Sequence, residues 1–566
     1  MKRIVSLFLI LAWIFTGAGC SRHTAGNPVQ TYHTDQSFST LSASGTDASL
    51  EIARGKELLF RLERGEVSGE HAQELLDART AAAKRLQTDA AIAYVRYCLD
   101  VTDEANKRAY DDLYMQLNTL QCILIDAAVL LSRDPALRDR YDAETVESLR
   151  RARSLSDLSV QPLLKRERDL VERYEALPEK LTVEYGGREW TGDGIVSDPT
   201  LNGEAYDALY EAYMTLFHAE AGAIYLELVD VRKTIAKTLG FDSYAAYMYA
   251  CWGRDYSPRD AALFSERVKT DLVPLFCDLQ RGFYSAAGRL YGAVFEQEST
   301  LERIGTALKE TVPELDEPWQ YMLSHGMYDF GTGTKRMPGS FTAYFAAYGA
   351  PFLFSSWTNG FEMPSTVIHE FGHYAAYYLN GEAAGAGNVL DLAEIDAQGL
   401  ELMTVLRYDT IYGTLSDAAE TAELLYALYA LSDGCAEDAF QQFAYGQETL
   451  TLEMLDAEYG RLCAEFGLDG LGTEKRSWTR IPHTFLSPFY YISYAVSMTA
   501  ALELYLLYRN DPDAARHAYR SVLLRDGGAR LSETLKKAGL ADPFAAATVR
   551  KTANALERIY RRKLTE

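Results

Sequence analysis

Apolar positions recur at three- and four-residue spacing along most of the chain, which predicts a mainly α-helical fold. The pattern runs from about Ala48 to Leu177 and again from about Gly203 to Val312, where Pro313 ends it. After Asp391 it resumes in segments with few breaks. These are expected at 418–446, at 450–466 and in an amphipathic tail at 521–561.

Two short regions have a different pattern. The run Leu181–Tyr185, the pair Gly186-Gly187 and the run Arg188–Trp190 predict a small β-hairpin. The aromatic runs Phe341–Phe345 and Pro351–Ser355 lie between turn-rich segments and predict two strands. The second run leads directly into a helix, and its edge could accept an extended peptide or could serve packing alone.

Composition is that of an ordinary folded protein, with 48% hydrophobic and 24% charged residues in 566. The length is enough for more than one structural subdomain. The formal net charge of −24 argues against nucleic acid as a partner, because the phosphate backbone would be repelled. It argues equally against adhesion to anionic lipid through the folded surface.

The first twenty residues are typical of a bacterial export signal. Lys2 and Arg3 precede a compact apolar run, and small residues stand immediately before Cys20. We expect a lipoprotein that is anchored to the extracytoplasmic face of a membrane through Cys20. The alternatives are a secreted or periplasmic protein, or an uncleaved anchor. Residues 21–48 are rich in small polar residues and predict a flexible tether, and no other segment is expected to span a bilayer.

Six further cysteines are scattered along the chain without the short spacing of a metal-binding or redox motif. A chain of this length does not need covalent cross-links, so buried free thiols are the expected state, and an extracytoplasmic disulfide is the alternative. They are Cys98, Cys122, Cys251, Cys277, Cys435 and Cys463.

The pentapeptide His369-Glu370-Phe371-Gly372-His373 carries the candidate chemistry. Pro364 suits the first turn of a helix and Asn380-Gly381 suits its end, which places this helix at about 364–379. Two histidines one helical turn apart share a face, so both imidazoles can reach one zinc ion. Glu370 lies between them and can take a proton from a zinc-bound water.

Glu394, 25 residues after His369, is the expected third ligand. Three protein ligands and one open position describe a catalytic zinc site, with one Zn²⁺ per chain. Glu401 lies two turns further along the same face and could hydrogen-bond a ligand imidazole. Asp391 and Asp396 are rivals for coordinating or outer roles and rank below Glu394.

A tetrahedral intermediate needs a hydrogen-bond donor for its oxyanion. Tyr490, Tyr491 and Tyr494 form a cluster shortly after His483, and Tyr490 and Tyr494 would share a face if that segment is helical. We expect at least one of these tyrosines to be catalytic and His483 to contact the substrate. The chain has 38 tyrosines, so packing is the competing role for each of them.

These motifs resemble the thimet oligopeptidase and oligoendopeptidase F family. The resemblance rests on the His369–His373 pentapeptide, on Ala393-Glu394-Ile395 with Glu401, and on His483 with Pro488-Phe489-Tyr490 and Tyr494. It covers roughly 203–561 and is closest in the two metal-binding segments. Two features depart from the family pattern: Asp396-Ala397 replaces a small residue and serine, and the interval from His483 to Pro488 is about one residue longer.

The resemblance implies a two-lobed helical ellipsoid with a deep substrate channel and a small sheet beside the zinc helix. It implies zinc ligands at His369, His373 and Glu394, the base at Glu370, and substrate or oxyanion contacts at His483 and Tyr490. We accordingly divide the chain into a signal (1–20), a tether (21–48), an N-terminal helical domain (49–202) and a catalytic domain (203–566).

The expected function is a monomeric zinc endopeptidase that cleaves internal bonds of short unfolded peptides by attack of a zinc-bound water. A peptidyl-dipeptidase or carboxypeptidase on the same scaffold is the nearest alternative. A non-catalytic peptide-binding lipoprotein would leave an intact Glu370 without a purpose. A zinc-stabilised structural protein would not need an open coordination position.

Overall fold

The computed structural model describes residues 33–563 except 142, 144, 147–148, 150–158 and 202. The described part is predominantly helical with two small sheets, as the apolar periodicity predicts. The predicted export signal and Cys20 lie outside the described residues.

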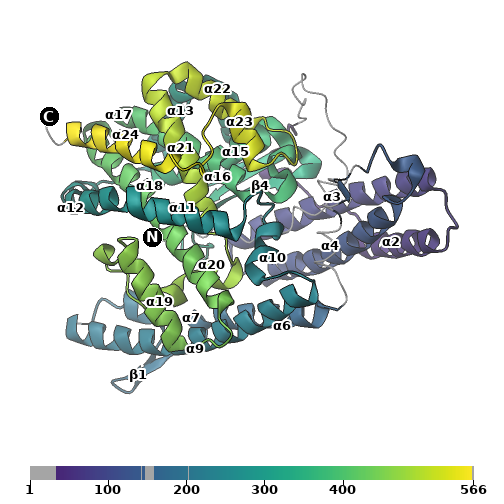
Figure 1. Ribbon diagram of the computed structural model, residues 1–566, viewed down its shortest axis with the longest axis horizontal. Coiled ribbons are helices and arrows are strands. Elements are labelled where there is room, and N and C mark those ends of the chain that lie inside the picture. The colour runs from purple at the N-terminus through teal and green to yellow at the C-terminus, as the bar shows by residue number, and fades with distance from the viewer. Residues whose placement is uncertain are drawn as a thin grey trace.

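A bundle of three long helices, α2 (Ala48–Glu63), α3 (Gly69–Leu99) and α4 (Glu104–Leu131), begins the fold and projects from one side of the body (Figure 1). Each helix starts at a side chain that accepts a backbone N–H from its first turn: Asp47, Ser68 and Asp103. Such caps satisfy donors that a helix start leaves without partners, and so set where each helix begins.

The middle of the chain forms a series of helices interrupted by the predicted hairpin. Gly186 and Gly187 both have positive φ, as the two-residue turn between its strands requires. The elements are α6 (Gln161–Glu175), α7 (Leu177–Lys180), β1 (Val183–Tyr185), β2 (Arg188–Trp190), α8 (Gly192–Ser197), α9 (Gly203–Thr238), α10 (Tyr244–Cys251), α11 (Pro258–Asp271), α12 (Val273–Leu290), α13 (Gln297–Thr311) and α14 (Asp316–Ser324).

The second sheet has the strand order β3-β5-β4. Strands β4 (Ser340–Phe345) and β5 (Ala350–Ser355) are the predicted aromatic pair and run antiparallel, and β3 (Tyr328–Asp329) adds to β5 in parallel. The strand that leads into the helix of His369 and His373 is therefore central, with β4 along one edge and β3 opposite Leu353 and Phe354 on the other. Because β3 already pairs with Leu353 and Phe354 on that edge, the structure favours the packing alternative for this strand over an edge that accepts a peptide.

The C-terminal half contains the four helices that surround the candidate site: α15 (Met363–Asn380), α16 (Leu390–Thr404), α18 (Ser416–Gly446) and α21 (Ile492–Asn510). The helix predicted at 364–379 is α15, one residue longer at each end. The remaining elements are α17 (Tyr408–Tyr412), α19 (Leu452–Glu465), α20 (Pro482–Leu486), α22 (Pro512–Leu523), α23 (Leu531–Ala538) and α24 (Thr548–Lys563).

The segment from His33 to Asp47 is held against the body instead of forming the predicted flexible tether. The Thr34 N–H donates to the Tyr348 carbonyl at 3.0 Å, and the His33 ring stacks on Tyr378 of α15 at a centroid distance of 3.8 Å. Phe38 packs against Phe352 of β5. The tether prediction is therefore wrong for residues 33–47, whose aromatic and backbone groups find partners on the sheet and on α15.

Two hydrophobic cores lie within the described residues. The smaller is built from α2, the first half of α3 and α4, and the larger takes in the second half of α3 and the rest of the fold. Val160, Leu170 and Tyr174 belong to the larger core. Apart from Leu41 and the second half of α3, which belong to the larger core, the cores divide the chain before α6, whereas the sequence places a domain boundary at residue 202.

Helix α4 is apolar and long enough to cross a membrane by length and composition alone. This differs from the expectation that no segment after the signal is long enough. Half of its most apolar window is buried inside the fold, where Leu120, Leu124 and Ile125 belong to the smaller core. A buried core helix can be as long and as apolar as a membrane-spanning helix, so length and composition alone do not indicate a membrane span here.

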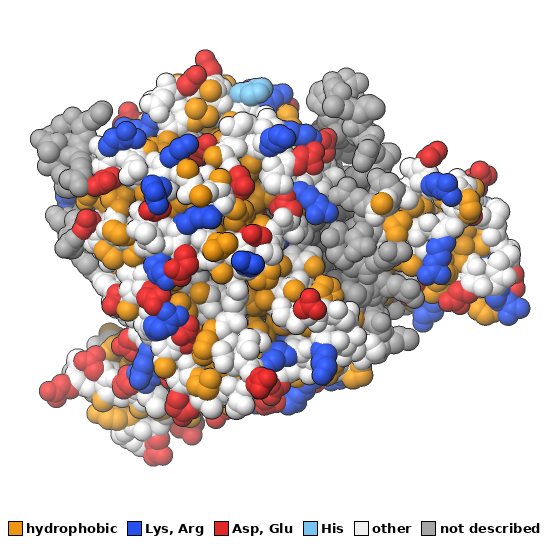
Figure 2. Space-filling model, viewed as in Figure 1, with side chains coloured by type: hydrophobic (Ala, Val, Ile, Leu, Met, Phe, Trp, Pro, Cys, Tyr) orange, Lys and Arg blue, Asp and Glu red, His pale blue; other side chains and the backbone are white. Residues whose placement is uncertain are grey.

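The surface carries acidic and basic side chains interspersed, and Figure 2 shows no single-sign patch on the face in view. All six cysteines from Cys98 onward are free, as the sequence predicts. Only three of them are buried as expected, and the other three are half-buried: Cys122, Cys251 and Cys277.

Candidate metal centre and active site

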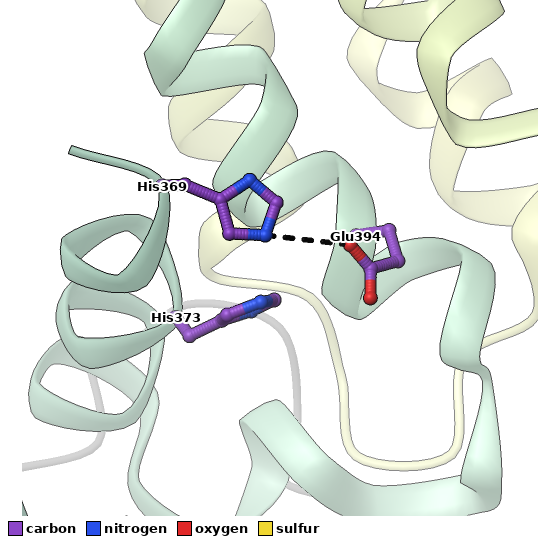
Figure 3. A group of neighbouring side chains, drawn as sticks. All are labelled: His369, His373 and Glu394. Atoms are coloured by element: carbon purple, nitrogen blue, oxygen red, sulfur yellow. Dashed lines mark ion pairs between the residues drawn. The ribbon is translucent and has the colours of Figure 1, made fainter. Parts of the chain in front are cut away.

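Helix α15 presents His369 and His373 from successive turns of one face. Pro364 stands in its first turn, where a missing N–H costs nothing. Figure 3 shows both rings pointing toward Glu394 of α16. The two ring centroids lie 5.2 Å apart with an interplanar angle of 86°. The helical spacing in the motif therefore brings the two imidazoles to one point.

A glycine allows α16 to lie this close to α15. A Cβ at Gly372 would overlap the Asp396 carbonyl oxygen and would lie 2.6 Å from the Ala397 Cα. Both contacts are with backbone, which cannot rotate away. Gly372 thus permits the separation between the two helices at which Glu394 reaches the histidines.

The ligand atoms of His369, His373 and Glu394 all lie within 4.8 Å of one another. The distance from His369 Nε2 to Glu394 Oε2 is 3.7 Å. Tetrahedral zinc with ligand distances near 2.1 Å separates its ligand atoms by roughly 3.4 Å. Two imidazoles and a carboxylate at this spacing fit a zinc ion, with a fourth position left for water or substrate.

Burial prepares His373 to act as a neutral ligand. Desolvation lowers the pKa of His373 well below its ordinary value, and the neighbouring His369 lowers it further. On the other side of the His369 ring, Nδ1 lies 3.0 Å from Glu401 Oε2. A ring N–H donated to Glu401 leaves the Nε2 lone pair directed at Glu394 and the metal position.

The two rival aspartates point elsewhere. Asp391 accepts a hydrogen bond from the Tyr256 hydroxyl at 3.1 Å, and Asp396 forms a buried ion pair with Arg525 at 2.7 Å. Both carboxylates are thus committed to other partners, and the structure brings neither into the His–His–Glu cluster.

Glu370 lies on the same helix and is buried with an exposed fraction of 6%. The Thr342 hydroxyl of β4 lies 2.9 Å from the Glu370 carbonyl oxygen and 3.2 Å from Glu370 Oε2. The small sheet therefore holds the side chain that the sequence assigns as the base.

The tyrosine cluster comes from the turn between α20 and α21. The Tyr490 hydroxyl donates to Glu394 Oε1 at 2.8 Å. The Tyr494 ring lies 5.2 Å from that of Tyr490, and the His483 ring lies 5.2 Å from Tyr490 and 5.1 Å from Tyr491. Burial raises the pKa of Tyr490 and of Tyr494, and the Glu394 carboxylate adds to this rise, so both hydroxyls keep their protons.

Phe489, the residue before Tyr490, has a strained backbone conformation that orients Tyr490. Phe489 has φ of 61°, which is rare for a residue with a side chain. Its N–H donates to Gln441 Oε1 at 2.7 Å, and its carbonyl accepts from an Arg254 Nη atom at 2.6 Å. Trp252 Nε1 donates to the preceding Pro488 carbonyl at 2.9 Å. These buried donors and acceptor offset the backbone strain.

The sequence predicts that His369, His373, three glutamates, the tyrosines and His483 belong to one site, but it does not reveal the side chains that hold them. Thr342, which contacts Glu370, and Arg254, which contacts the Phe489 carbonyl, lie far from the motifs along the chain. Only their burial as polar residues in apolar surroundings could have singled them out, and burial cannot be read from spacing.

Fold and site together define a helical scaffold around a buried His–His–Glu cluster with a neighbouring glutamate. No family model matches the chain. In sequence it is 26% identical over 213 residues to the oligopeptidase PepF of Bacillus subtilis, a match that covers 34% of this chain and 31% of PepF. The chain thus matches about a third of the length of that curated relative.

Solved structures give a broader likeness. An X-ray structure assigned to oligoendopeptidase F has a TM-score of 0.76 at 22% identity, and so does PZ peptidase A with an inhibitor. Each comparison covers 92% of this chain and 98% of the other. A structure assigned to oligoendopeptidase F from Bacillus anthracis has a TM-score of 0.73 at 21% identity, covering 93% and 98%. The chain has the oligoendopeptidase F fold, and the resemblance expected from its motifs is confirmed.

Proposed function

We propose that this protein is a zinc-dependent oligopeptidase that hydrolyses internal bonds of short, unfolded peptides. The observation that carries the proposal is the convergence of three ligand atoms within 4.8 Å beside a buried glutamate on the same helix. Similarity to peptidases in fold and in part of the sequence supports the same class of reaction.

His369, His373 and Glu394 would hold the zinc ion. When bound, zinc supplies a Lewis acid for the scissile carbonyl and makes water a nucleophile near neutral pH. Glu370 accepts the proton of the attacking water and returns it to the leaving amine. Thr342 keeps Glu370 in place through the hydrogen bond to its carboxylate.

The tyrosine cluster supplies a donor for the charge that develops on the carbonyl oxygen. Tyr490 and Tyr494 stay protonated because burial raises the pKa of each, so each can donate a hydrogen bond at neutral pH. His483 packs against Tyr490 and Tyr491, where it can contact bound peptide. A deep channel around these groups remains part of the proposal.

Glu370→Gln tests the reaction, because it removes the base and keeps the shape of the side chain. We expect kcat on a quenched peptide to fall by roughly 10²–10⁴ while zinc content stays at one per chain. Glu362→Gln, at the residue before α15, is the matched control and should leave kcat unchanged. Cleavage that survives Glu370→Gln or exhaustive chelation would refute the mechanism.

Peptides with free and amidated C-termini test where the enzyme cuts. An endopeptidase should cleave both at similar rates. A peptidyl-dipeptidase or carboxypeptidase needs the terminal carboxylate and should reject the amide.

The export signal leads to a separate proposal about location. We propose that Cys20 is lipidated and anchors the protein on the extracytoplasmic side of a membrane, on the strength of residues 1–20 alone. Fatty-acid labelling of the wild-type protein should be lost in Cys20→Ser. Labelling that persists in Cys20→Ser would contradict the anchor.

A further inference from the structure

Helix α20, which carries His483, is a single short turn of the chain, Pro482–Leu486. A helix this short closes few backbone hydrogen bonds of its own. The Ser487 N–H donates to the His483 carbonyl at 2.8 Å, which closes the helix at its end. Contacts with the rest of the fold must therefore set where α20 lies.

Tyr174 of α6 attaches to the chain on both sides of His483. Its hydroxyl donates to the Thr479 carbonyl at 3.0 Å, shortly before α20 begins. Its ring stacks on Phe485 with a centroid distance of 3.8 Å and an interplanar angle of 8°. Both side chains are buried. His483 thus stands between two points of the chain that one buried side chain fixes.

Arg232 of α9 holds the same phenylalanine through its backbone. One Nη atom of Arg232 donates to the Phe485 carbonyl, and the other donates to the Tyr445 hydroxyl at 3.1 Å. Its Nε donates to Glu167 Oε1 at 2.6 Å. A carbonyl near the end of a helix has no partner within that helix, and a guanidinium is a strong donor for it. The exposed fraction of Arg232 is 1%, so these bonds are shielded from water and fix the Phe485 carbonyl in place.

Both residues come from helices outside the metal cluster. Helix α6 packs against α9 and contacts α20 (Figure 1), whereas α15 and α16 carry the three ligand residues. Tyr174 also falls in the segment 49–202, which the sequence assigns to an N-terminal domain separate from the catalytic one. That segment thus helps to hold a helix of the candidate active site.

We propose that Tyr174 and Arg232 are positioning residues for His483, holding α20 where the imidazole can contact bound peptide. The inference rests on the proposed function, in which His483 contacts the substrate, and deepens it by naming what places that contact. A displacement of about 1 Å in a substrate-binding group can cost roughly 100-fold in rate. Zinc binding should be unaffected, because its ligands lie on α15 and α16.

A double-mutant cycle on the full-length, zinc-loaded protein tests this, with kcat/KM on a quenched peptide as the readout. Arg232→Met should lower kcat/KM by roughly 10–100-fold, and His483→Ala by a similar factor. The double variant should stay within about threefold of His483→Ala alone, because a residue that acts through His483 then has nothing left to place. If Arg232 has only a general structural role, the two losses should multiply instead.

Tyr174→Phe decides the question if Arg232→Met does not fold. It removes one hydroxyl and keeps the stacked ring, so kcat/KM should fall about three- to tenfold in the wild-type background and stay unchanged in His483→Ala. Arg516→Met is the matched control. Arg516 donates to backbone carbonyls at the end of α13 instead, so its loss should leave kcat/KM unchanged.

Losses that multiply in the cycle would overturn the inference, while zinc-dependent cleavage by the wild type would still support the proposed function. Wild-type kcat/KM in both Arg232→Met and Tyr174→Phe would overturn it in the same way. Wild-type kcat/KM in His483→Ala would also overturn it, and would remove His483 from the substrate contacts. A wild-type protein without zinc-dependent cleavage would overturn the inference and the proposed function together.

Discussion

The Tyr490 hydroxyl donates its hydrogen bond to Glu394, the carboxylate that completes the metal cluster, at 2.8 Å. A phenol has one proton to donate, so it cannot serve Glu394 and an oxyanion at the same time. In the proposed mechanism, therefore, Tyr490 can stabilise the oxyanion only after substrate binding has broken its hydrogen bond to Glu394.

Tyr490→Phe tests this assignment. We expect kcat to fall about 10²–10³-fold, the usual cost of losing one oxyanion donor. Zinc content should remain at one per chain, because the ligand atoms are untouched. Tyr494→Phe should cost roughly tenfold less, since Tyr494 packs against Tyr490 and Tyr491 whereas Tyr490 is the tyrosine that contacts Glu394 directly. Steady-state kinetics of both variants measure the two losses. A larger fall in kcat for Tyr494→Phe than for Tyr490→Phe would make Tyr494 the oxyanion donor.

Gly372→Ala should disturb the metal cluster without touching a ligand. The added methyl group meets the backbone of Asp396 and Ala397, so α15 and α16 must move apart. We expect a loss of about 1–3 kcal/mol in the free energy of unfolding, together with weaker zinc binding. Gly446→Ala in α18 is the control, because nothing lies within 4 Å of its Cβ. Normal zinc binding by Gly372→Ala would show that α15 and α16 can move apart without displacing the ligand atoms.

Arg254→Met should lower turnover through the backbone of Phe489. The substitution removes the donor to the Phe489 carbonyl and to the Ser493 hydroxyl, so the strained turn loses a buried partner. We expect kcat/KM to fall about tenfold or more with zinc content unchanged. Arg259→Met, an exposed substitution on α11, serves as the comparison. If turnover stayed at the wild-type level, Gln441 and Trp252 would suffice to hold the turn.

Asp433 of α18 should make stability depend on pH. Burial raises the pKa of its carboxyl from 3.8 to about 7, with the Tyr429 hydrogen bond opposing the rise. The folded protein then holds this proton more tightly than the unfolded one. The resulting stabilisation is complete below about pH 4 and is lost as the pH rises through about 7.

Asp433→Asn removes that dependence. The free energy of unfolding of wild type relative to Asp433→Asn should fall by on the order of 2 kcal/mol between pH 5 and pH 8. Denaturant unfolding at the two pH values measures this difference. Asp112→Asn on the exposed face of α4 should show none. A difference that is the same at both pH values would mean that Asp433 does not titrate in this range.

Local patterns along the chain were enough to predict the helices, the hairpin and the strand pair. The apolar period, the Gly186-Gly187 turn and Pro364 act within a few residues, so they can be read from sequence. Strand β3 was missed because two residues carry no alternation, and the central place of β5 depends on that distant partner. The residues of a strand do not show which distant segment will pair with it.

The site shows the same limit. The histidine spacing and Glu394 follow from helix geometry, and the structure brings their ligand atoms together. Asp391 and Asp396 could be ranked below Glu394, but their actual partners, Tyr256 and Arg525, lie more than a hundred residues away in sequence. The packing of His33 and Phe38 was missed for the same reason, since a short polar segment gives no periodic signal.

Helix α3 belongs to both cores, and it reaches the sheet at several points. Thr88 accepts the Ala347 N–H, the Cys98 carbonyl accepts the Met337 N–H, and the Tyr94 ring meets Phe341 on β4. Thr342 is the next residue on that strand and touches Glu370. Helix α3 thus connects the projecting bundle rigidly to β4. A change in the position of the bundle relative to the body would therefore displace the strand whose Thr342 contacts Glu370.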